Sequence, residues 1–213
     1  MDGIASRTDG PRGKENGVDL IDLPLFPLRM VLFPGGSLAL RIFERRYLDL
    51  VRDSARDASE FGICLIMDGE EAGAPATPVA VGTAARISDF ESLPGGLLGI
   101  TVAGRGRFRV HSTRVRDNGL VTARVEPWPD EPRVPVPPEH GLLATILERL
   151  VEQVGGSRAK AARACFDDAS WVGFRLAELL PLAMAERQQL LETTDPLLRL
   201  EQLTHYLPRF QDG

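Results

Sequence analysis

The stretch that decides the fold covers residues 24–46 and reads PLFPLRMVLFPGGSLALRIFERR. It joins an apolar run punctuated by prolines to the start of a helix. Leu38, Leu40 and Ile42 recur at strand spacing, because successive strand residues point to opposite faces. Residues 44–57 then place an apolar stripe on a helix that is otherwise covered in charge. The sequence therefore predicts strands that are interrupted by one amphipathic helix.

Short strands separated by Gly, Pro, Asp and Ser are predicted from Leu23 to Val125. The clearest alternation runs over residues 97–111, where apolar and arginine side chains take opposite parities. Gly104 and Gly106 interrupt this stretch and predict a β-bulge that shifts the parity. Without that bulge, the arginines would all point outward.

A change of period follows the segment 127–138, PWPDEPRVPVPP, in which six of the twelve residues are proline. Proline lacks the amide donor that strands and helix interiors need, so this segment is predicted to be a semi-rigid linker. Helical periodicity follows over 140–154, from a Ser170 cap to Pro181, over 182–193, and from Asp195–Pro196 to Tyr206. The predicted organisation is α+β: an arm without regular structure (1–18), a β-rich domain (19–126), the linker (127–138) and a helical subdomain (139–208).

Several short motifs occur along the chain in a fixed order. They are Leu23-Pro24-Leu25, Phe33-Pro34-Gly35, Ile42-Phe43-Glu44 with Arg46 and Tyr47, Phe61-Gly62-Ile63, Val81-Gly82-Thr83-Ala84, GRGRFRV over 104–110, ARVEP over 123–127 and LLETTDPLLRLEQL over 190–203. This order resembles the substrate-recruiting N-terminal domain of Lon proteases over roughly residues 21–207. The resemblance implies a β-rich, PUA-like pseudo-barrel followed by a helical subdomain, and a role in recruiting clients for proteolysis.

No catalytic, metal or cofactor site is predicted. The sequence lacks the G-x-x-x-x-G-K-[ST] phosphate loop of an ATPase, and neither lysine has the setting of a Ser-Lys dyad. Ser37 is followed by strand spacing instead of the helix of a nucleophile elbow. The three histidines are scattered without ligands at metal spacing. A hidden hydrolase would need a convergent pocket that no local spacing supports.

Composition favours an ordinary globular protein, with 43% hydrophobic and 26% charged residues. No apolar run approaches the roughly 18 residues of a membrane span, and residues 1–18 lack the apolar core of a signal peptide. A cytoplasmic location is therefore predicted, with Cys64 and Cys165 as free thiols. The net charge of -5 argues against non-specific nucleic-acid binding by the whole molecule.

The favoured hypothesis is a non-enzymatic binding protein that recognises an unfolded or extended polypeptide, or a protein partner. It rests partly on the resemblance and partly on apolar side chains that exceed what one strand pair buries. The candidate contacts are Met30, Phe33, Pro34, Phe43, Arg46 and Trp128.

The alternative hypothesis is a PUA-like RNA-binding module. Arg105, Arg107 and Arg109 would supply its polyanion-binding face, because same-face strand residues lie about 6.6 to 7 Å apart, close to the phosphate spacing of an extended strand. RNA binders usually add exposed aromatic side chains, whereas the parity of Phe108 points to the core. A solvated or acid-paired arginine face is the competing interpretation.

Overall fold

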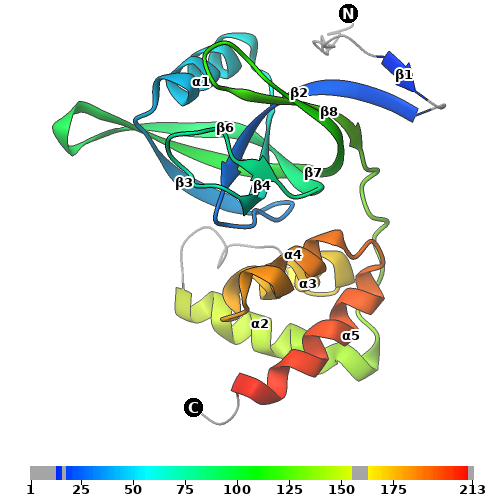
Figure 1. The fold of residues 1–213 in the computed structure, drawn as a ribbon. Coiled ribbons are helices and arrows are strands. Elements are labelled where there is room, and N and C mark those ends of the chain that lie inside the picture. Colours follow the sequence, from blue (N-terminus) through cyan, green and yellow to red (C-terminus); the bar gives the residue numbers. More distant parts are fainter. Residues whose placement is uncertain (1–12, 16–17, 155–162, 211–213) are drawn as a thin grey trace, which may run out of the picture. The chain divides into compact units, whose positions relative to one another are not determined.

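The structure, a computed structural model, describes residues 13–15, 18–154 and 163–210. The chain divides into two compact units, Met1–Pro129 and Asp130–Gly213 (Figure 1). The first unit holds the strands and one α-helix, and the second holds the other α-helices. This arrangement confirms the predicted α+β class and the order of strands before helices.

The first unit is built around a closed barrel. β2 pairs antiparallel with β8 and parallel with β4, and the order β8-β7-β6-β4 completes the ring. Closure satisfies the backbone groups that a strand edge would leave open. The elements of this unit are β1 (Gly13–Glu15), β2 (Val18–Leu28), β3 (Ser37–Ile42), α1 (Arg45–Asp57), β4 (Phe61–Asp68), β5 (Thr77–Pro78), β6 (Val81–Leu93), the 3-10 turn Pro94–Gly96, β7 (Leu97–Val115) and β8 (Val121–Pro127).

The second half of β2 is buried on both faces and so belongs to two apolar clusters. Phe26 and Leu28 join the cluster that α1 covers, where the Tyr47 ring stacks on Phe26 at 3.9 Å between centroids. Leu23 and Leu25 join the second cluster, which contains Phe108, and Ile21 packs against it. The Phe108 ring packs so closely on Gly82 that a Cβ there would lie 2.7 Å from it. Residues 23–28 therefore form a continuous apolar run, whereas the first half of β2 carries the exposed Asp19 and the half-buried Asp22.

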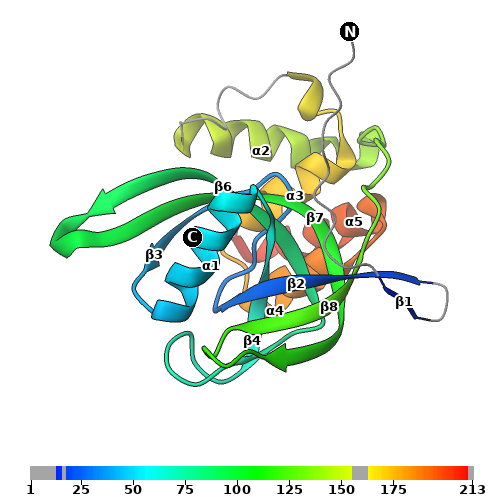
Figure 2. The ribbon, with the colours of Figure 1, turned by 90° about the horizontal axis from the view of Figure 1, so that it is seen from above.

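A long hairpin of β6 and β7 extends away from the barrel, as Figure 2 shows. β3 pairs with the first part of β7 in six consecutive antiparallel pairs, from Ser37↔Ala103 to Ile42↔Leu98. Beyond Ala85, β6 pairs only with β7 in the part of the chain that the structure describes. The hairpin and β3 therefore form a three-stranded section, in the order β3-β7-β6.

The N-terminal arm differs in part from its prediction. Gly13–Glu15 forms β1, which pairs antiparallel with the start of β2 within the predicted 1–18 segment. Backbone pairing alone can hold so short a strand, so the absence of large apolar residues does not prevent it. Residues 1–12 and 16–17 lie outside the described residues.

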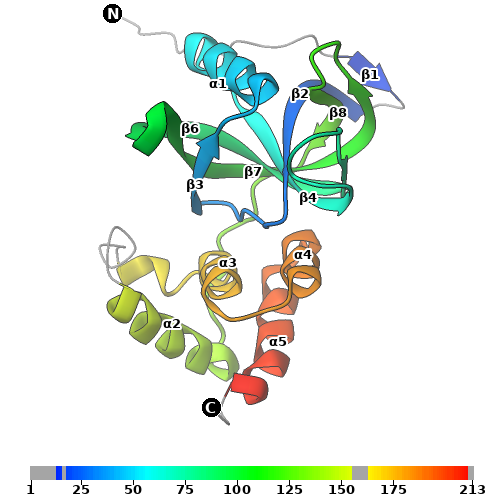
Figure 3. The same cartoon turned by 60° about the vertical axis from the view of Figure 1, so that its left-hand side comes forward.

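The second unit packs three helices around α3, which contacts α2, α4 and α5 (Figure 3). Asp195 caps α5 as predicted, since its carboxylate accepts hydrogen bonds from the amides of Leu197 and Leu198. The cap of α3 is Asp168 instead of the predicted Ser170, whose amide donates to the Asp168 carboxylate. The helices are α2 (Gly141–Val154), α3 (Ala169–Leu179), α4 (Met184–Glu192) and α5 (Pro196–Tyr206), with 3-10 turns at Pro138–His140, Arg163–Cys165 and Leu207–Phe210.

The proline-rich segment is anchored to the second unit and is not a free spacer over its whole length. The Val136 amide donates to the Asp167 carbonyl at 3.0 Å, and the Ala169 amide donates to the Val134 carbonyl at 2.8 Å. Pro135 and Asp168 form an antiparallel bridge between these two bonds. Prolines permit this pairing because the residues between them keep their amides.

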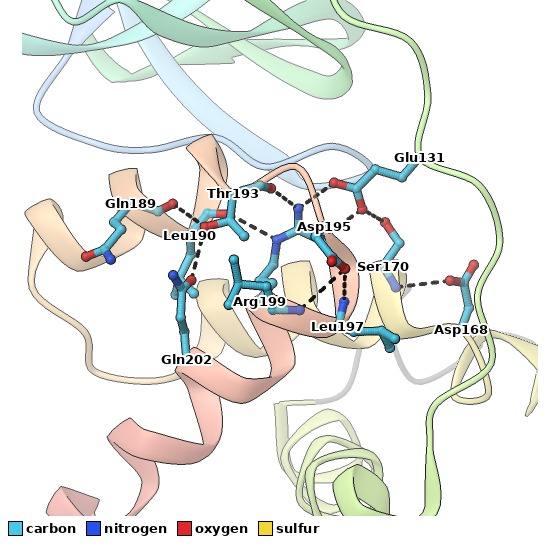
Figure 4. A network of polar contacts seen from close by, with 11 residues as sticks. Glu131, Asp168, Ser170, Gln189, Leu190, Thr193, Asp195, Leu197, Arg199 and Gln202 are labelled. Atoms are coloured by element: carbon cyan, nitrogen blue, oxygen red, sulfur yellow. Dashed lines mark hydrogen bonds and ion pairs between the residues drawn. The ribbon is translucent and has the colours of Figure 1, made fainter.

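An ion pair fastens the same segment to α5 (Figure 4). The fully buried Arg199 guanidinium donates from Nη1 to Glu131 Oε2 at 2.9 Å and from Nη2 to Oε1. It also donates to the carbonyls of Leu190 and Thr193, and it lies over the Phe174 ring. A buried charge requires such a full set of partners.

Candidate functional site

Two exposed methionines each follow the point where β2 and β4 stop pairing with one another. The parallel pairing of these strands stops at Leu28↔Leu65, two residues before Met30 and Met67 in each strand. Their side chains are 44% and 67% exposed. Methionine is flexible and polarisable, so it adapts to partners of different shapes. We call Met30 and Met67 the methionine pair.

Contacts of Arg29 hold the chain beside this pair. The Arg29 guanidinium donates to the Gly69 carbonyl at 3.2 Å and lies 2.7 Å from the Glu70 carboxylate. Its backbone amide donates to Glu71 Oε1 at 2.5 Å. The loop after β4 is thereby tied to the end of β2, which places both methionines on supported backbone.

A second apolar surface lies on the outer face of the three-stranded section. Leu97 of β7 pairs with Leu93 of β6. The last pair of β3 with β7 is Ile42↔Leu98, so the next residue of the chain, Phe43, lies opposite Leu97. Ile42 is buried in the core, so the neighbouring Phe43 points to the other face. Phe43 is 61% exposed. We call Phe43, Leu93 and Leu97 the outer row.

Phe90 is 52% exposed but belongs to the opposite face of this section. It pairs with Ile100, which is buried in the cluster under α1. The Asp89 carboxylate accepts a hydrogen bond from the Phe90 amide at 2.8 Å, so this part of the β6 edge already has a partner. Phe90 therefore marks the rim of the core and not a continuation of the outer row.

Two of the predicted contact residues are buried, and their side chains do not reach a surface. Phe33 is fully buried in the core because the turn at Pro34, which is half-buried, folds it inward. Arg46 is buried with its Nη1 donating to the Gly119 carbonyl at 3.3 Å and its Nη2 3.0 Å from the Glu44 carboxylate. It ties α1 to the turn between β7 and β8. The prediction of surface contacts is wrong for Phe33 and Arg46.

Trp128 continues the pairing of β8 with β7, since its amide donates to the Arg107 carbonyl at 2.9 Å. Its ring is partly exposed and lies beneath two guanidinium groups, 5.0 Å from Arg107 and 5.5 Å from Arg109. Such cation–π contacts explain how a tryptophan between two prolines is held. They also occupy one face of the ring.

The predicted bulge occurs in β7. Thr83 pairs with Arg107 and Ala85 pairs with Gly104, so three steps along β7 face two along β6. Arg107 is buried, whereas Arg105 is exposed beside Glu60 at 3.7 Å and Arg109 is exposed as well. The arginines do not form one uniform outward stripe, because the extra residue changes the parity between Arg105 and Arg107, while Arg107 and Arg109 both lie over the Trp128 ring.

Other chemistry is limited in the part of the chain that the structure describes. No group of three or more His, Cys, Asp or Glu side chains there could hold a metal ion. No helix among the same residues has the length and hydropathy needed to cross a bilayer. Burial raises the pKa of the Cys64 thiol far above its usual value, which suppresses the thiolate.

Sequence reasoning missed Met67, Phe90 and Leu97 as exposed apolar residues. Met67 ends an apolar run that otherwise fills the core. Phe90 and Leu97 flank the turn Pro94–Gly96 at the tip of the hairpin. The sequence signal for each of them is a turn close by: Pro94-Gly95-Gly96 for Phe90 and Leu97, and Asp68-Gly69 for Met67.

Known proteins resemble this chain across most of its length. Lon protease from Anaeromyxobacter dehalogenans (strain 2CP-C) is 28% identical over 195 residues, which cover 88% of this chain and 23% of that protein. Lon protease 2 from Myxococcus xanthus is 29% identical over 209 residues, which cover 93% and 25%. The chain thus spans about a quarter of the length of these curated relatives.

Solved structures of Lon N-terminal domains have the same fold. The crystal structure of a Lon N-terminal domain protein from Xanthomonas campestris is 49% identical, with a TM-score of 0.74 over 87% of this chain and 98% of that one. The N-terminal domain of Mycobacterium avium complex Lon protease is 17% identical, with a TM-score of 0.60 over 84% and 94%, and shows likeness of fold alone. The family model of the ATP-dependent protease La (LON) substrate-binding domain matches residues 22–209, and the chain belongs to this family.

Proposed function

We propose that this protein is a non-catalytic recognition module that binds apolar segments of unfolded or extended polypeptides. The observation that carries the proposal is the exposure of large apolar side chains on the barrel unit, the methionine pair and the outer row above all. Membership of a substrate-binding family supports the same role. The contact residues are Met30, Phe43, Met67 and Leu97, with Trp128 as a further candidate.

The physical basis is a rigid support that carries adaptable side chains. The methionine pair adjoins barrel strands and the outer row lies on paired strands that continue from the barrel, so binding does not have to order the protein's own backbone. Flexible methionines and an exposed phenylalanine gain contact area with many sequences, which suits clients that share apolar character but no common motif. Removal of apolar surface from water would then supply most of the affinity.

Polyanion binding by Arg105, Arg107 and Arg109 has weaker support. Arg107 is buried against Trp128, and Arg105 lies near the Glu60 carboxylate. A nucleic acid would have to compete with these contacts. Base stacking would also have to use Trp128, whose ring already carries two arginines.

The experiment is a fluorescence anisotropy titration of the protein against a labelled, permanently unfolded polypeptide and a labelled single-stranded RNA, each at low and physiological salt. Saturable polypeptide binding that survives salt is expected, because apolar contacts are not screened. Polar replacement of Phe43 and Met67 together should weaken it, whereas Val115→Ser, which removes another exposed apolar residue, should not. RNA binding that collapses with salt, together with no polypeptide binding, would refute the proposal.

A further inference from the structure

β3 is an edge strand with one paired side. Its six residues pair in unbroken register with β7, and no strand pairs with its other side in the part of the chain that the structure describes. An edge of this kind presents a row of backbone donors and acceptors to another chain. The barrel strands are closed on themselves, and the other described strands with one paired side, β1 and β5, are only three and two residues long, against six in β3.

The opposite edge of the three-stranded section is protected against pairing. The register of β6 shifts between Ile87 and Asp89, which indicates a bulge, and the Asp89 carboxylate accepts the hydrogen bond of the Phe90 amide. Bulges and charged side chains are the features by which proteins block an edge strand. β3 has a regular register and no side chain that caps its backbone among the described residues.

The side chains of β3 point to the two faces of the sheet and so do not cover its free edge. Ser37 and Ala39 are small and exposed on the outer face, and the inward residues Leu40 and Ile42 are buried. Phe43 follows directly, so an added strand would lie beside the outer row. Backbone pairing and an aromatic anchor would then act on the same bound segment.

The charge near Phe43 indicates what such a segment contains. Arg41 and Arg45 flank it in sequence, and both are exposed. Neither has an ion-pair partner among the described side chains, in contrast to Arg46, which is paired with Glu44. Acidic side chains on a bound strand would complement these arginines.

We propose that the free edge of β3 binds an extended polypeptide segment by strand addition, with an apolar residue of that segment on Phe43 and an acidic residue beside Arg41. This binding mode rests on the proposed function and specifies how the client is held. It also predicts a preference for apolar segments that carry acidic neighbours.

The test uses the full chain and a labelled probe peptide with the repeat Val-Thr-Glu-Thr, so that valine and glutamate alternate along one face of the bound strand, as Phe43 and Arg41 do at the end of β3. Two analogues carry N-methyl groups on alternate amides, one analogue for each parity. In strand addition only one parity faces β3, so one analogue should lose binding and the other should keep it. Equal effects of the two analogues would overturn the proposal, because apolar capture without backbone pairing does not distinguish them.

Variants of the protein locate the site. Phe43→Ala should weaken binding of the probe about tenfold, because it removes an aromatic anchor. Phe90→Ala is the matched control, because Phe90 is similarly exposed but lies on the protected strand. Arg41→Glu should reverse the preference, so that a probe with lysine in place of glutamate binds better. If Phe43→Ala has no effect, or dimerisation through β3 excludes the probe, the proposal is refuted.

The two proposals can fail separately. If the unfolded polypeptide binds and only substitutions in the methionine pair reduce that binding, the proposed recognition of polypeptides is supported and strand addition at β3 is refuted. If neither the polypeptide nor the probe binds, both fall. Circular dichroism of each variant confirms that the fold is kept.

Discussion

Replacing Glu131 with Gln should destabilise the helical unit by about 3 kcal/mol, the lower end of the cost of breaking a buried ion pair. The carboxylate neutralises the buried Arg199 guanidinium and accepts two of its hydrogen bonds. Glutamine keeps one acceptor but turns an amide donor toward a cation, which removes one charge-assisted bond worth about 1.5–3 kcal/mol. The carbonyls of Leu190 and Thr193 and the Phe174 ring still hold the guanidinium, so we expect no larger loss.

The assay is urea unfolding followed by tryptophan fluorescence. The sequence contains two tryptophans, so Trp128→Phe leaves Trp171 in α3 as the reporter of the helical unit. Asp130→Asn is the matched control, because this neighbouring carboxylate is exposed. Adding Arg199→Met to the glutamate variant should cost less than the sum of the two single changes, since no unpaired charge remains. A glutamate variant within about 0.5 kcal/mol of the parent would refute the reasoning.

Gly82→Ala should destabilise the barrel by about 1–3 kcal/mol, because the new Cβ would lie 2.5 Å from Cys64 Sγ and 2.6 Å from a backbone carbonyl; an unchanged melting temperature would contradict this. In the folded protein at mildly alkaline pH, Cys165 should react with a thiol reagent well before Cys64, because burial raises the pKa of the Cys64 thiol and closes access to it; equal rates would count against the packing described. Arg209 donates two hydrogen bonds to Glu186 and lowers the pKa of its carboxyl below the usual 4.5. The contribution of this ion pair to folding stability is therefore present above pH 4.5 and is lost as the pH falls through the lowered pKa of the folded state. The urea midpoint of Glu186→Gln should consequently depend less on pH in acid than that of the parent, and parallel profiles would exclude the effect.

Local signals in the sequence were sufficient for most elements of the fold. The helix predicted over residues 44–57 is found at Arg45–Asp57, and the Asp195–Pro196 start of α5 is correct. These predictions succeed because caps and helical periodicity involve residues within a few positions of each other. The glycines of GRGRFRV likewise marked the bulge in β7.

Contacts between residues that lie far apart in the sequence could not be predicted from such local signals. The bond between Glu131 and Arg199 joins positions 68 residues apart, and proline content alone suggested that Glu131 lies in a spacer. Phe33 and Phe43 each directly follow an aliphatic residue in the sequence, yet one is buried and the other is exposed. Which aromatic residue faces outward depends on the pairing of β3 with β7, a tertiary choice that no single segment encodes.

The anchored proline segment also determines where the chain could be cut. A helical piece that began after the last proline, at Glu139, would lack the partner strand of Asp168 and would leave the guanidinium of Arg199 without its counter-ion. A piece that began at Asp130 would keep both. The boundary for producing the helical part separately, or for joining it to another barrel, therefore lies at Asp130, within the proline-rich segment, and not at its end.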